Sequence, residues 1–155
     1  MSCRSFGTPE GDPIVSDAYR VRLRTVGHGP TALGEGGDFT LTVDRPAAAG
    51  GGGLGSNGGQ LLYLAIAACW SNDLYREAAT MGIELDGVEI SVDGDFPARG
   101  EGSTPIAVDL TIRSTAPQER LRELVAEVER VAEIPLAIRD SPPIAVTATF
   151  GASTR

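Results

Sequence analysis

The residue whose side chain is most capable of chemistry is Cys69, which lies near the end of a long apolar run at residues 61–70. A helix over this run would carry Asp73 one turn after Cys69 and Arg76 two turns after it. The apolar surroundings and Asp73 would raise the pKa of the thiol, whereas a nearby Arg76 would lower it. Cys69 is therefore either an inert packing residue or a protected nucleophile, and the residues alone leave both interpretations open.

Two further residues could act on this thiol. His28 is the only histidine and could be the base of a thiol–imidazole pair, although its glycine-rich turn is also typical of a solvated side chain. Cys3 is the only other cysteine and could resolve an oxidised Cys69, or be a tail residue without a partner. One histidine and one interior cysteine cannot build a zinc site without several carboxylates, so we expect no metal and no other cofactor.

The composition limits the classes of partner. The 155-residue chain has a formal charge of −8, and all 13 of its basic residues are arginine. An acidic protein without a basic cluster is a poor binder of nucleic acids or anionic membranes, and the absence of lysine excludes Schiff-base chemistry. No signal-peptide pattern opens the chain, and the longest apolar run is about half of the ~20 residues that a membrane span needs. We therefore expect a cytoplasmic protein.

The pattern along the chain predicts a short tail followed by one domain. Residues 1–13 lack periodicity and are expected to form a flexible N-terminal tail, and residues 14–155 a single domain. Alternation of apolar and polar residues predicts three strands, of which the first is half-buried: residues 19–25, 31–33 and 39–43. A glycine-rich turn at residues 34–37 would separate the last two strands.

A second glycine-rich segment, residues 50–59, leads into the apolar helix. It lacks the spaced glycines and the lysine of nucleotide-binding loops, so we expect a flexible connection, with close approach of a substrate to the helix as the alternative. The helix should begin at Ser56 or Asn57, which are good N-caps, and end at Met81, with Gly82 as its C-cap.

The second half of the chain predicts an antiparallel hairpin, a helix and a last strand. The hairpin strands fall at residues 88–92 and 106–112, and Thr115 opens a capping box for a helix that Ile134 and Pro135 end or kink. The last strand covers residues 144–150. The order β-β-β-α-β-β-α-β indicates an α+β fold. Since its long central helix is apolar on every side, we expect a buried helix that a second subunit partly covers in a homodimer.

The motifs around the helix resemble those of the OsmC/Ohr family, the osmotically inducible protein C and organic hydroperoxide resistance proteins. The resemblance rests on the glycine-rich approach, the Ser-Asn-Gly-Gly-Gln-Leu-Leu that starts at Ser56, and the Ala-Ala-Cys that ends at Cys69. It extends over residues 15–150, and the run that starts at Asn72 is similar to a divergent OsmC-like branch. The resemblance implies an intertwined homodimer with two sites at the subunit interface.

The resemblance also implies roles for single residues. In active members a cysteine at the position of Cys69 attacks a peroxide, activated by an arginine after the first strand and a glutamate ten residues before the cysteine. A second cysteine, just before a proline of the last helix, then forms a disulfide. In this chain these three partner positions hold His28, Gly59 with Gln60 beside it, and Ile134.

Three functions are compatible with these residues. The first is a thiol peroxidase of the oxidative stress response, which reduces organic hydroperoxides through Cys69 without the usual resolving cysteine and relies on an external thiol reductant. His28, a remote arginine or Gln60 would assist the thiol. The alternative is a non-catalytic OsmC-fold module that binds a small lipophilic ligand at the dimer interface. A hydrolase with a Cys69–His28 dyad is the third.

Overall fold

The structure is a computed structural model that describes residues 19–149 of the chain. It divides into two compact units, residues 1–57 and 58–155, which are described separately below. The tail predicted for residues 1–13, with Cys3, lies outside the described residues, and the single domain expected for residues 14–155 stays a prediction. No helix in the part described is long and apolar enough to cross a membrane.

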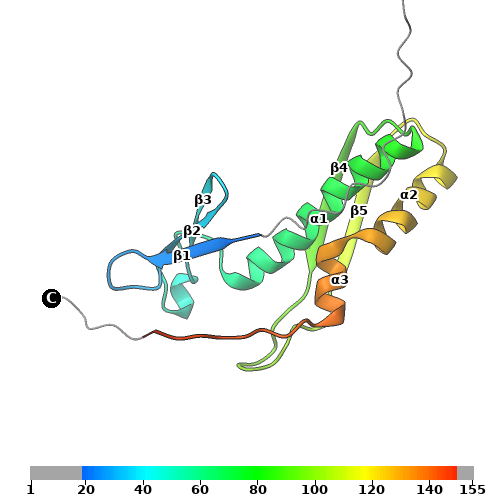
Figure 1. The fold of residues 1–155 in the computed structure, drawn as a ribbon. Helices are drawn as coiled ribbons and strands as arrows, with labels where there is room; N and C mark the ends of the chain where they lie inside the picture. The colour runs from blue at the N-terminus through cyan, green and yellow to red at the C-terminus, as the bar shows by residue number, and fades with distance from the viewer. Residues whose placement is uncertain (1–18, 150–155) are drawn as a thin grey trace, which may run out of the picture. The chain divides into compact units, whose positions relative to one another are not determined.

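The N-terminal unit contains a three-stranded antiparallel sheet (Figure 1). Its strands are β1 (Val21–Thr25), β2 (Ala32–Gly36) and β3 (Phe39–Val43), in the order β1-β2-β3. The three predicted strands are therefore confirmed. The turn predicted at residues 34–37 is displaced, because residues 34–36 pair with both neighbouring strands and the chain reverses at Gly37, which has a positive φ of 59°.

The prediction that β1 is half-buried is wrong for the described chain. Val21 and Leu23 form the apolar side of this strand, yet they are 81% and 56% exposed. The alternating pattern is present, but nothing in the described part of the N-terminal unit covers this face of the sheet.

A single buried carboxylate, that of Asp44, organises the glycine-rich segment. Its Oδ2 accepts hydrogen bonds from Thr31 Oγ1 at 3.1 Å, Gly52 N at 3.0 Å and Leu54 N at 3.2 Å, and its Oδ1 accepts one from Arg45 N at 2.7 Å. Burial alone would raise the pKa of Asp44, but these hydrogen bonds outweigh it and lower the pKa below its usual value.

The segment is consequently a built turn and not the flexible connection predicted from composition. It includes a short 3₁₀ helix, η1 (Ala47–Ala49), and a bridge that pairs Val43 with Ser56. Glycine is required where the backbone passes close to itself: a Cβ at Gly51 would collide with the carbonyl of Arg45. The carboxylate and these close approaches together fix the path of the chain.

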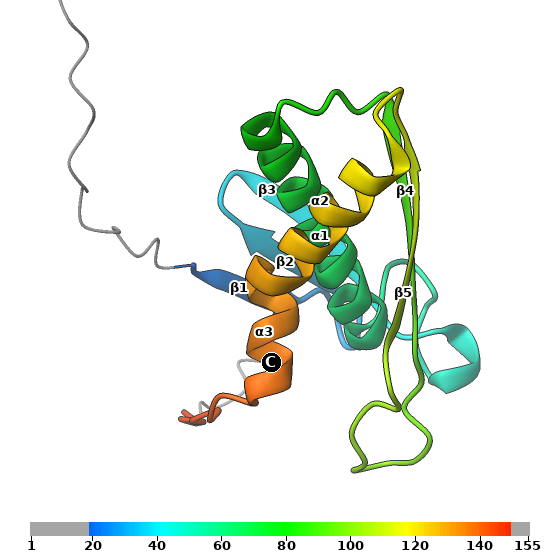
Figure 2. The same ribbon diagram turned by 90° about the vertical axis from the view of Figure 1, so that its right-hand side faces the viewer.

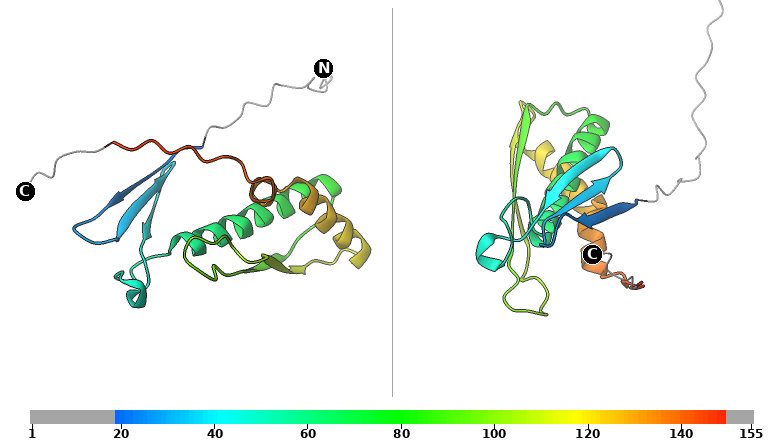
Figure 3. Two further views of the ribbon diagram at one scale, coloured as in Figure 1. Left: turned by 90° about the horizontal axis from the view of Figure 1, so that it is seen from below. Right: turned by 90° about the vertical axis from the view of Figure 1, so that its left-hand side faces the viewer.

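The C-terminal unit packs three helices on a hairpin. The helices are α1 (Gly58–Met81), α2 (Gln118–Val131) and α3 (Glu133–Asp140), and the antiparallel hairpin pairs β4 (Gly87–Asp93) with β5 (Ala107–Arg113). Figures 2 and 3 show α1 lying along the hairpin, with α2 against α1. The core is apolar and buried: Ile66, Trp70, Leu74, Ala78, Ile83, Leu124, Val128 and Ala132.

Helix α1 has the predicted length, and its own chain buries one side of it. It begins directly after Asn57 and ends at Met81, and Gly82 follows in a left-handed conformation with φ of 66°. Its buried residues recur on one stripe, whereas Leu64 is 61% exposed and Tyr75 is 47% exposed. The helix is thus buried on one side by its own chain, and its other side is open in the described residues.

Two predictions for the last third of the chain need correction. The capping box at Thr115 does not form, because α2 begins at Gln118 and its N-terminal boundary residue is Pro117, with no side-chain cap. Ser114 instead accepts a hydrogen bond from the Ala116 N–H, at 3.1 Å. The helix does end before Pro135, as predicted, since Ala132 adopts an extended conformation and a separate helix, α3, follows.

The last predicted strand, residues 144–150, is also wrong as far as the structure describes it. Residues 141–149 form no strand, and Ile144 and Val146 are 89% and 86% exposed. Their alternation suits a strand, but a strand also needs a hydrogen-bonded neighbour, and no described strand pairs with them. Phe150 lies outside the described residues.

We predict that protonation of Asp44 loosens the glycine-rich turn. Because the folded-state pKa of Asp44 lies below its unfolded value of about 3.9, its contribution to stability is present above that pH and is lost as the pH falls through the folded pKa. The NMR amide signals of Gly52 and Leu54 should shift together in this acidic range. In Asp44→Asn they should not titrate, and the melting temperature should fall. The control is Asp38→Asn, which changes an exposed carboxylate in the turn between β2 and β3. Equal melting temperatures for the two variants would contradict the role of Asp44 in the glycine-rich turn.

Candidate active site

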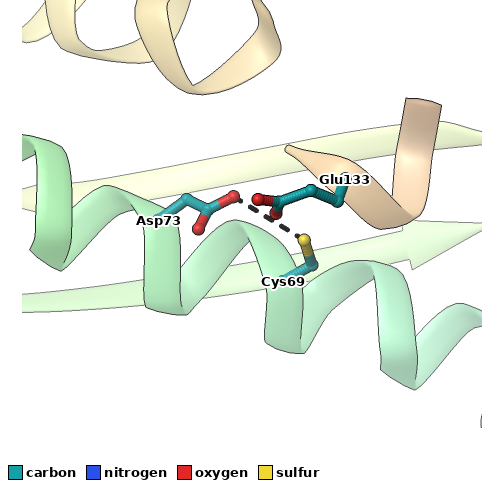
Figure 4. Close-up of side chains that lie close together, drawn as sticks. All are labelled: Cys69, Asp73 and Glu133. Carbon is teal, nitrogen blue, oxygen red and sulfur yellow. Dashed lines mark hydrogen bonds between the residues drawn. The ribbon is translucent and has the colours of Figure 1, made fainter. Parts of the chain in front are cut away.

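Helix α1 and the start of α3 together surround Cys69. The cysteine lies in the middle of α1, is half-buried, and packs against the edge of the apolar core. The helical repeat places Asp73 one turn further along the same face. The break at Ala132 redirects the chain, so that the first turn of α3 lies over the thiol (Figure 4).

The thiol of Cys69 is in polar contact with a buried carboxylate. Cys69 Sγ donates a hydrogen bond to Asp73 Oδ2 at 3.6 Å, which Figure 4 marks as a dashed line. Asp73 is only 3% exposed, and its other oxygen, Oδ1, pairs with Arg76 Nη1 at 2.8 Å. Arg76 also pairs through Nε with Glu77 Oε1 at 2.9 Å. The cation that could have approached the thiol is therefore held by two carboxylates.

Two groups of α3 complete the surroundings of the sulfur. The Glu133 carboxylate faces Cys69 and Asp73 in Figure 4, and one ligand atom from each of the three residues lies within 4.8 Å of the others. The backbone of Ile134 hydrogen-bonds the sulfur. Ile134 is the position that the family resemblance assigns to the resolving cysteine, and in this chain it brings its main chain to the sulfur in place of a thiol.

These surroundings keep the thiol protonated at neutral pH. Burial raises the pKa of Cys69 above its ordinary value, the Ile134 hydrogen bond acts against this, and the charges of Asp73 and Glu133 raise it further. The pKa of Asp73 is also raised, chiefly by burial and in part by Glu133, although Arg76 lowers it. Asp73 raises the pKa of the thiol, as predicted. Arg76, which was expected to lower that pKa, instead forms ion pairs with Asp73 and Glu77.

The donor set of Cys69, Asp73 and Glu133 is the only group of three potential metal ligands among residues 19–149. A thiolate with two carboxylates could contribute to a borderline-soft cation such as Zn²⁺, which normally takes four ligands. Here, however, Asp73 Oδ1 is already paired with Arg76. The cluster therefore suits proton exchange between thiol and carboxylate better than it suits a metal.

The other residues singled out from the sequence lie away from this cluster or in the other unit. His28 lies in the exposed turn after β1, in the N-terminal unit, so its pairing with Cys69 stays a prediction. Gly59 and Gln60 lie in the first turn of α1, and Gln60 is nine residues before Cys69, or about 13 Å along the helix axis at 1.5 Å per residue. Their roles also stay predictions.

Glu133 is the residue that the sequence reasoning missed. One signal could have found it, because it directly precedes Ile134, the position that the resemblance places at the thiol. The redirection of the chain at Ala132 was also foreseeable from Pro135, but which side chain it would turn toward Cys69 was not.

A cavity of about 790 Å³ lies between the helices and the hairpin of the C-terminal unit. Most of its lining is aliphatic or aromatic, contributed by α1, β5, α2 and α3, with polar groups that include Ser103, Glu129 and Arg139. Trp70, the only tryptophan of the chain, is part of the wall. Its size and lining are those of a site for a small, mainly apolar molecule.

Several solved structures share the fold of the chain. An OsmC-like protein from Mycoplasma pneumoniae aligns with a TM-score of 0.70 and 18% identity over 81% of this chain and 89% of its own. An organic hydroperoxide resistance protein OsmC from Legionella pneumophila aligns with a TM-score of 0.64 and 22% identity, covering 81% and 91%. An organic hydroperoxide resistance protein from Elizabethkingia anophelis gives 0.61 and 15%, covering 81% and 91%.

The sequence itself carries the same relationship. No curated protein is similar enough to the chain to count as a match. The family model described as OsmC-like protein, however, matches residues 50–147, which include the glycine-rich turn, the whole of α1 with Cys69, and both later helices. This span is more than half of the chain, and its fold agrees with that of the solved structures. The chain therefore belongs to the OsmC-like protein family.

Proposed function

We propose that the protein is a thiol peroxidase that reduces organic hydroperoxides with Cys69 as its nucleophile. The observation that carries this proposal is the half-buried Cys69 thiol, hydrogen-bonded to the buried Asp73 within the segment that matches the family. Relatives of the same fold are described as organic hydroperoxide resistance proteins. A partly shielded thiol is accessible to a small peroxide and protected from larger oxidants.

The reaction needs a reductant from outside the site. Attack by Cys69 on a hydroperoxide gives a cysteine sulfenic acid and an alcohol, and the sulfenic acid must then be reduced by a thiol. Ile134 occupies the place at the sulfur where a resolving cysteine is expected, so an external thiol takes that role. We place the reaction in the cytoplasm, where thiol reductants are abundant.

Replacing the sulfur should abolish the activity. In Cys69→Ser, the steady-state reduction of tert-butyl hydroperoxide with dithiothreitol should fall to the uncatalysed rate, because a serine hydroxyl is not oxidised by peroxide. Cys3→Ser is the matched control and should keep the wild-type rate. Equal rates for Cys69→Ser and the wild type would exclude Cys69 as the nucleophile.

We further propose that the protein acts as an intertwined homodimer. The support is the open side of α1, where Leu64 and Tyr75 are exposed although the helix is apolar over ten residues. A large apolar surface on one helix is typical of a protein interface. The exposed apolar residues of β1 and of residues 144–149 would be covered by the same association.

The dimer can be tested by its mass. Light scattering should give about twice the 16.1 kDa of the chain at micromolar concentration. Leu64→Asp should shift the equilibrium toward the monomer, because a charge would be buried against the partner helix. A wild-type protein that remains monomeric over the whole accessible concentration range would refute the proposal.

The cavity favours a second function, binding of a small lipophilic ligand without catalysis. A volume of about 790 Å³ with a mainly apolar lining is large enough for a medium-length acyl chain. This function does not require a reactive thiol, so it differs from the peroxidase in its dependence on Cys69.

Binding can be followed through Trp70, the only tryptophan, which lines the cavity. Decanol and decanoic acid should change its fluorescence and raise the melting temperature equally in the wild type and in Cys69→Ala. Val125→Phe should weaken binding by filling the cavity, whereas Ala107→Phe, on the exposed side of β5, should not. Absence of both responses with either ligand would count against this function.

A further inference from the structure

Asp73 is unusual among the carboxylates of the described residues because it is buried and in contact with the candidate nucleophile. Only two side chains with a carboxylate are buried there, Asp44 and Asp73, and Asp44 belongs to the glycine-rich turn. The two oxygens of Asp73 have different partners, since Oδ1 pairs with Arg76 and Oδ2 accepts the thiol hydrogen bond. Oδ2 is thus directed at the sulfur.

A buried thiol needs a neighbouring group that helps it to lose its proton before it can attack a peroxide. The nucleophile in a reaction with peroxide is the thiolate. Within residues 19–149 no cation is shown in contact with the sulfur of Cys69 to stabilise a thiolate, and Arg76, two turns further along α1, is bound to Asp73 and Glu77. A base in contact with the thiol removes this difficulty if it takes the proton during the reaction. The leaving alkoxide then needs a proton, and the protonated base can return it.

We propose, on the premise that Cys69 is the peroxidase nucleophile, that Asp73 is the general base and general acid of the reaction, and that Arg76 is the positioning residue that directs Asp73 Oδ2 at the sulfur. Asp73 takes the proton of the thiol as sulfur attacks the terminal oxygen of the hydroperoxide. The S–O bond forms, the O–O bond breaks, and the proton passes from Asp73 to the alkoxide. Cysteine is oxidised by two electrons to the sulfenic acid, the hydroperoxide is reduced to the alcohol, and Asp73 ends as it began.

The charged surroundings suit both halves of this exchange. The groups that act on Asp73 are Arg76 and Glu77 of α1 and Glu133 of α3. Burial and Glu133 raise the pKa of Asp73 and so favour its protonated form, whereas Arg76 lowers the pKa and favours the carboxylate that can accept a proton. Glu133 is also negative, but its principal effect on the thiol is electrostatic, and it raises the pKa of Cys69.

The test compares two reagents on the same thiol in a Cys3→Ser background. Iodoacetamide needs the thiolate but no acid, whereas tert-butyl hydroperoxide needs both the thiolate and a proton for its leaving group. In Asp73→Asn the pKa of Cys69 should fall, because a neighbouring negative charge is lost, so alkylation should become faster. Oxidation by the peroxide should nevertheless become about 100-fold slower, the usual contribution of a general acid–base.

Glu133→Gln is the matched control, since it removes a nearby negative charge but not the proposed base. Both reactions should become faster in this variant. An unchanged or increased rate of peroxide reduction in Asp73→Asn, or identical responses of the two variants, would overturn the role of Asp73. That result, with activity still lost in Cys69→Ser, would leave the peroxidase proposal standing. Full activity in Cys69→Ser would instead remove the peroxidase proposal itself.

A measurement on the protein with Asp73 and Glu133 intact covers the case in which Asp73→Asn does not fold. At pH 7, Cys69 should react with iodoacetamide more slowly than free cysteine and with tert-butyl hydroperoxide faster than free cysteine. If both reactions are slower than those of free cysteine, the carboxylate only suppresses the thiol, and the proposal is refuted.

Discussion

The arrangement around Cys69 depends on one ion pair, between the buried carboxylate of Asp73 and the guanidinium of Arg76. Asp73 lies beside the stripe of α1 that packs into the core, where an unpaired charge would be costly. Arg76, about half exposed, reaches back along the helix to satisfy it. Because Arg76 pairs with Oδ1 of Asp73, the second oxygen, Oδ2, accepts the hydrogen bond of the thiol. This ion pair therefore both compensates the buried charge and fixes which carboxylate oxygen faces Cys69.

This solution differs from the one that the family resemblance implies. There an arginine and a glutamate activate the cysteine, and a cation stabilises the thiolate. The resemblance puts His28 at the arginine position of this chain and Gly59 at the glutamate position. Within the described residues, the charged groups that act on Cys69 are the carboxylates of Asp73 and Glu133. An environment of this kind disfavours a standing thiolate and favours a thiol that is deprotonated only during reaction.

Sequence reasoning located most elements, because helices and strands follow from local periodicity. Helix α1 was predicted to end at Met81, where it does end, and the hairpin β4–β5 was predicted within a residue or two. What it could not supply was burial and pairing, which depend on partners distant in the chain. The strand expected at residues 144–150 has the right alternation but no described neighbour, and Val21 has an apolar pattern without a covering layer.

In the candidate site, too, contacts between residues close in the sequence were predictable and contacts between distant residues were not. Asp73 is one turn from Cys69 by helix geometry alone, so its contact with the thiol followed from the sequence. Glu133 is 64 positions further on than Cys69, and its approach depends on the bend at Ala132. Composition also failed to predict that the glycine-rich turn is well ordered. It suggests flexibility but does not reveal that Asp44 accepts hydrogen bonds from the amides of Gly52 and Leu54.

Helix α3 has two neighbours at once. Its first turn lies at the sulfur of Cys69, through Glu133 and Ile134, and its later residues, including Ile138, line the cavity. A molecule that enters the cavity and displaces this short helix would therefore also change the surroundings of the sulfur. By thermodynamic linkage, oxidation of the sulfur would alter the affinity of the cavity by the same factor as occupancy of the cavity alters the oxidation equilibrium. Helix α3 is thus the element through which occupancy of the cavity and oxidation of Cys69 would be coupled.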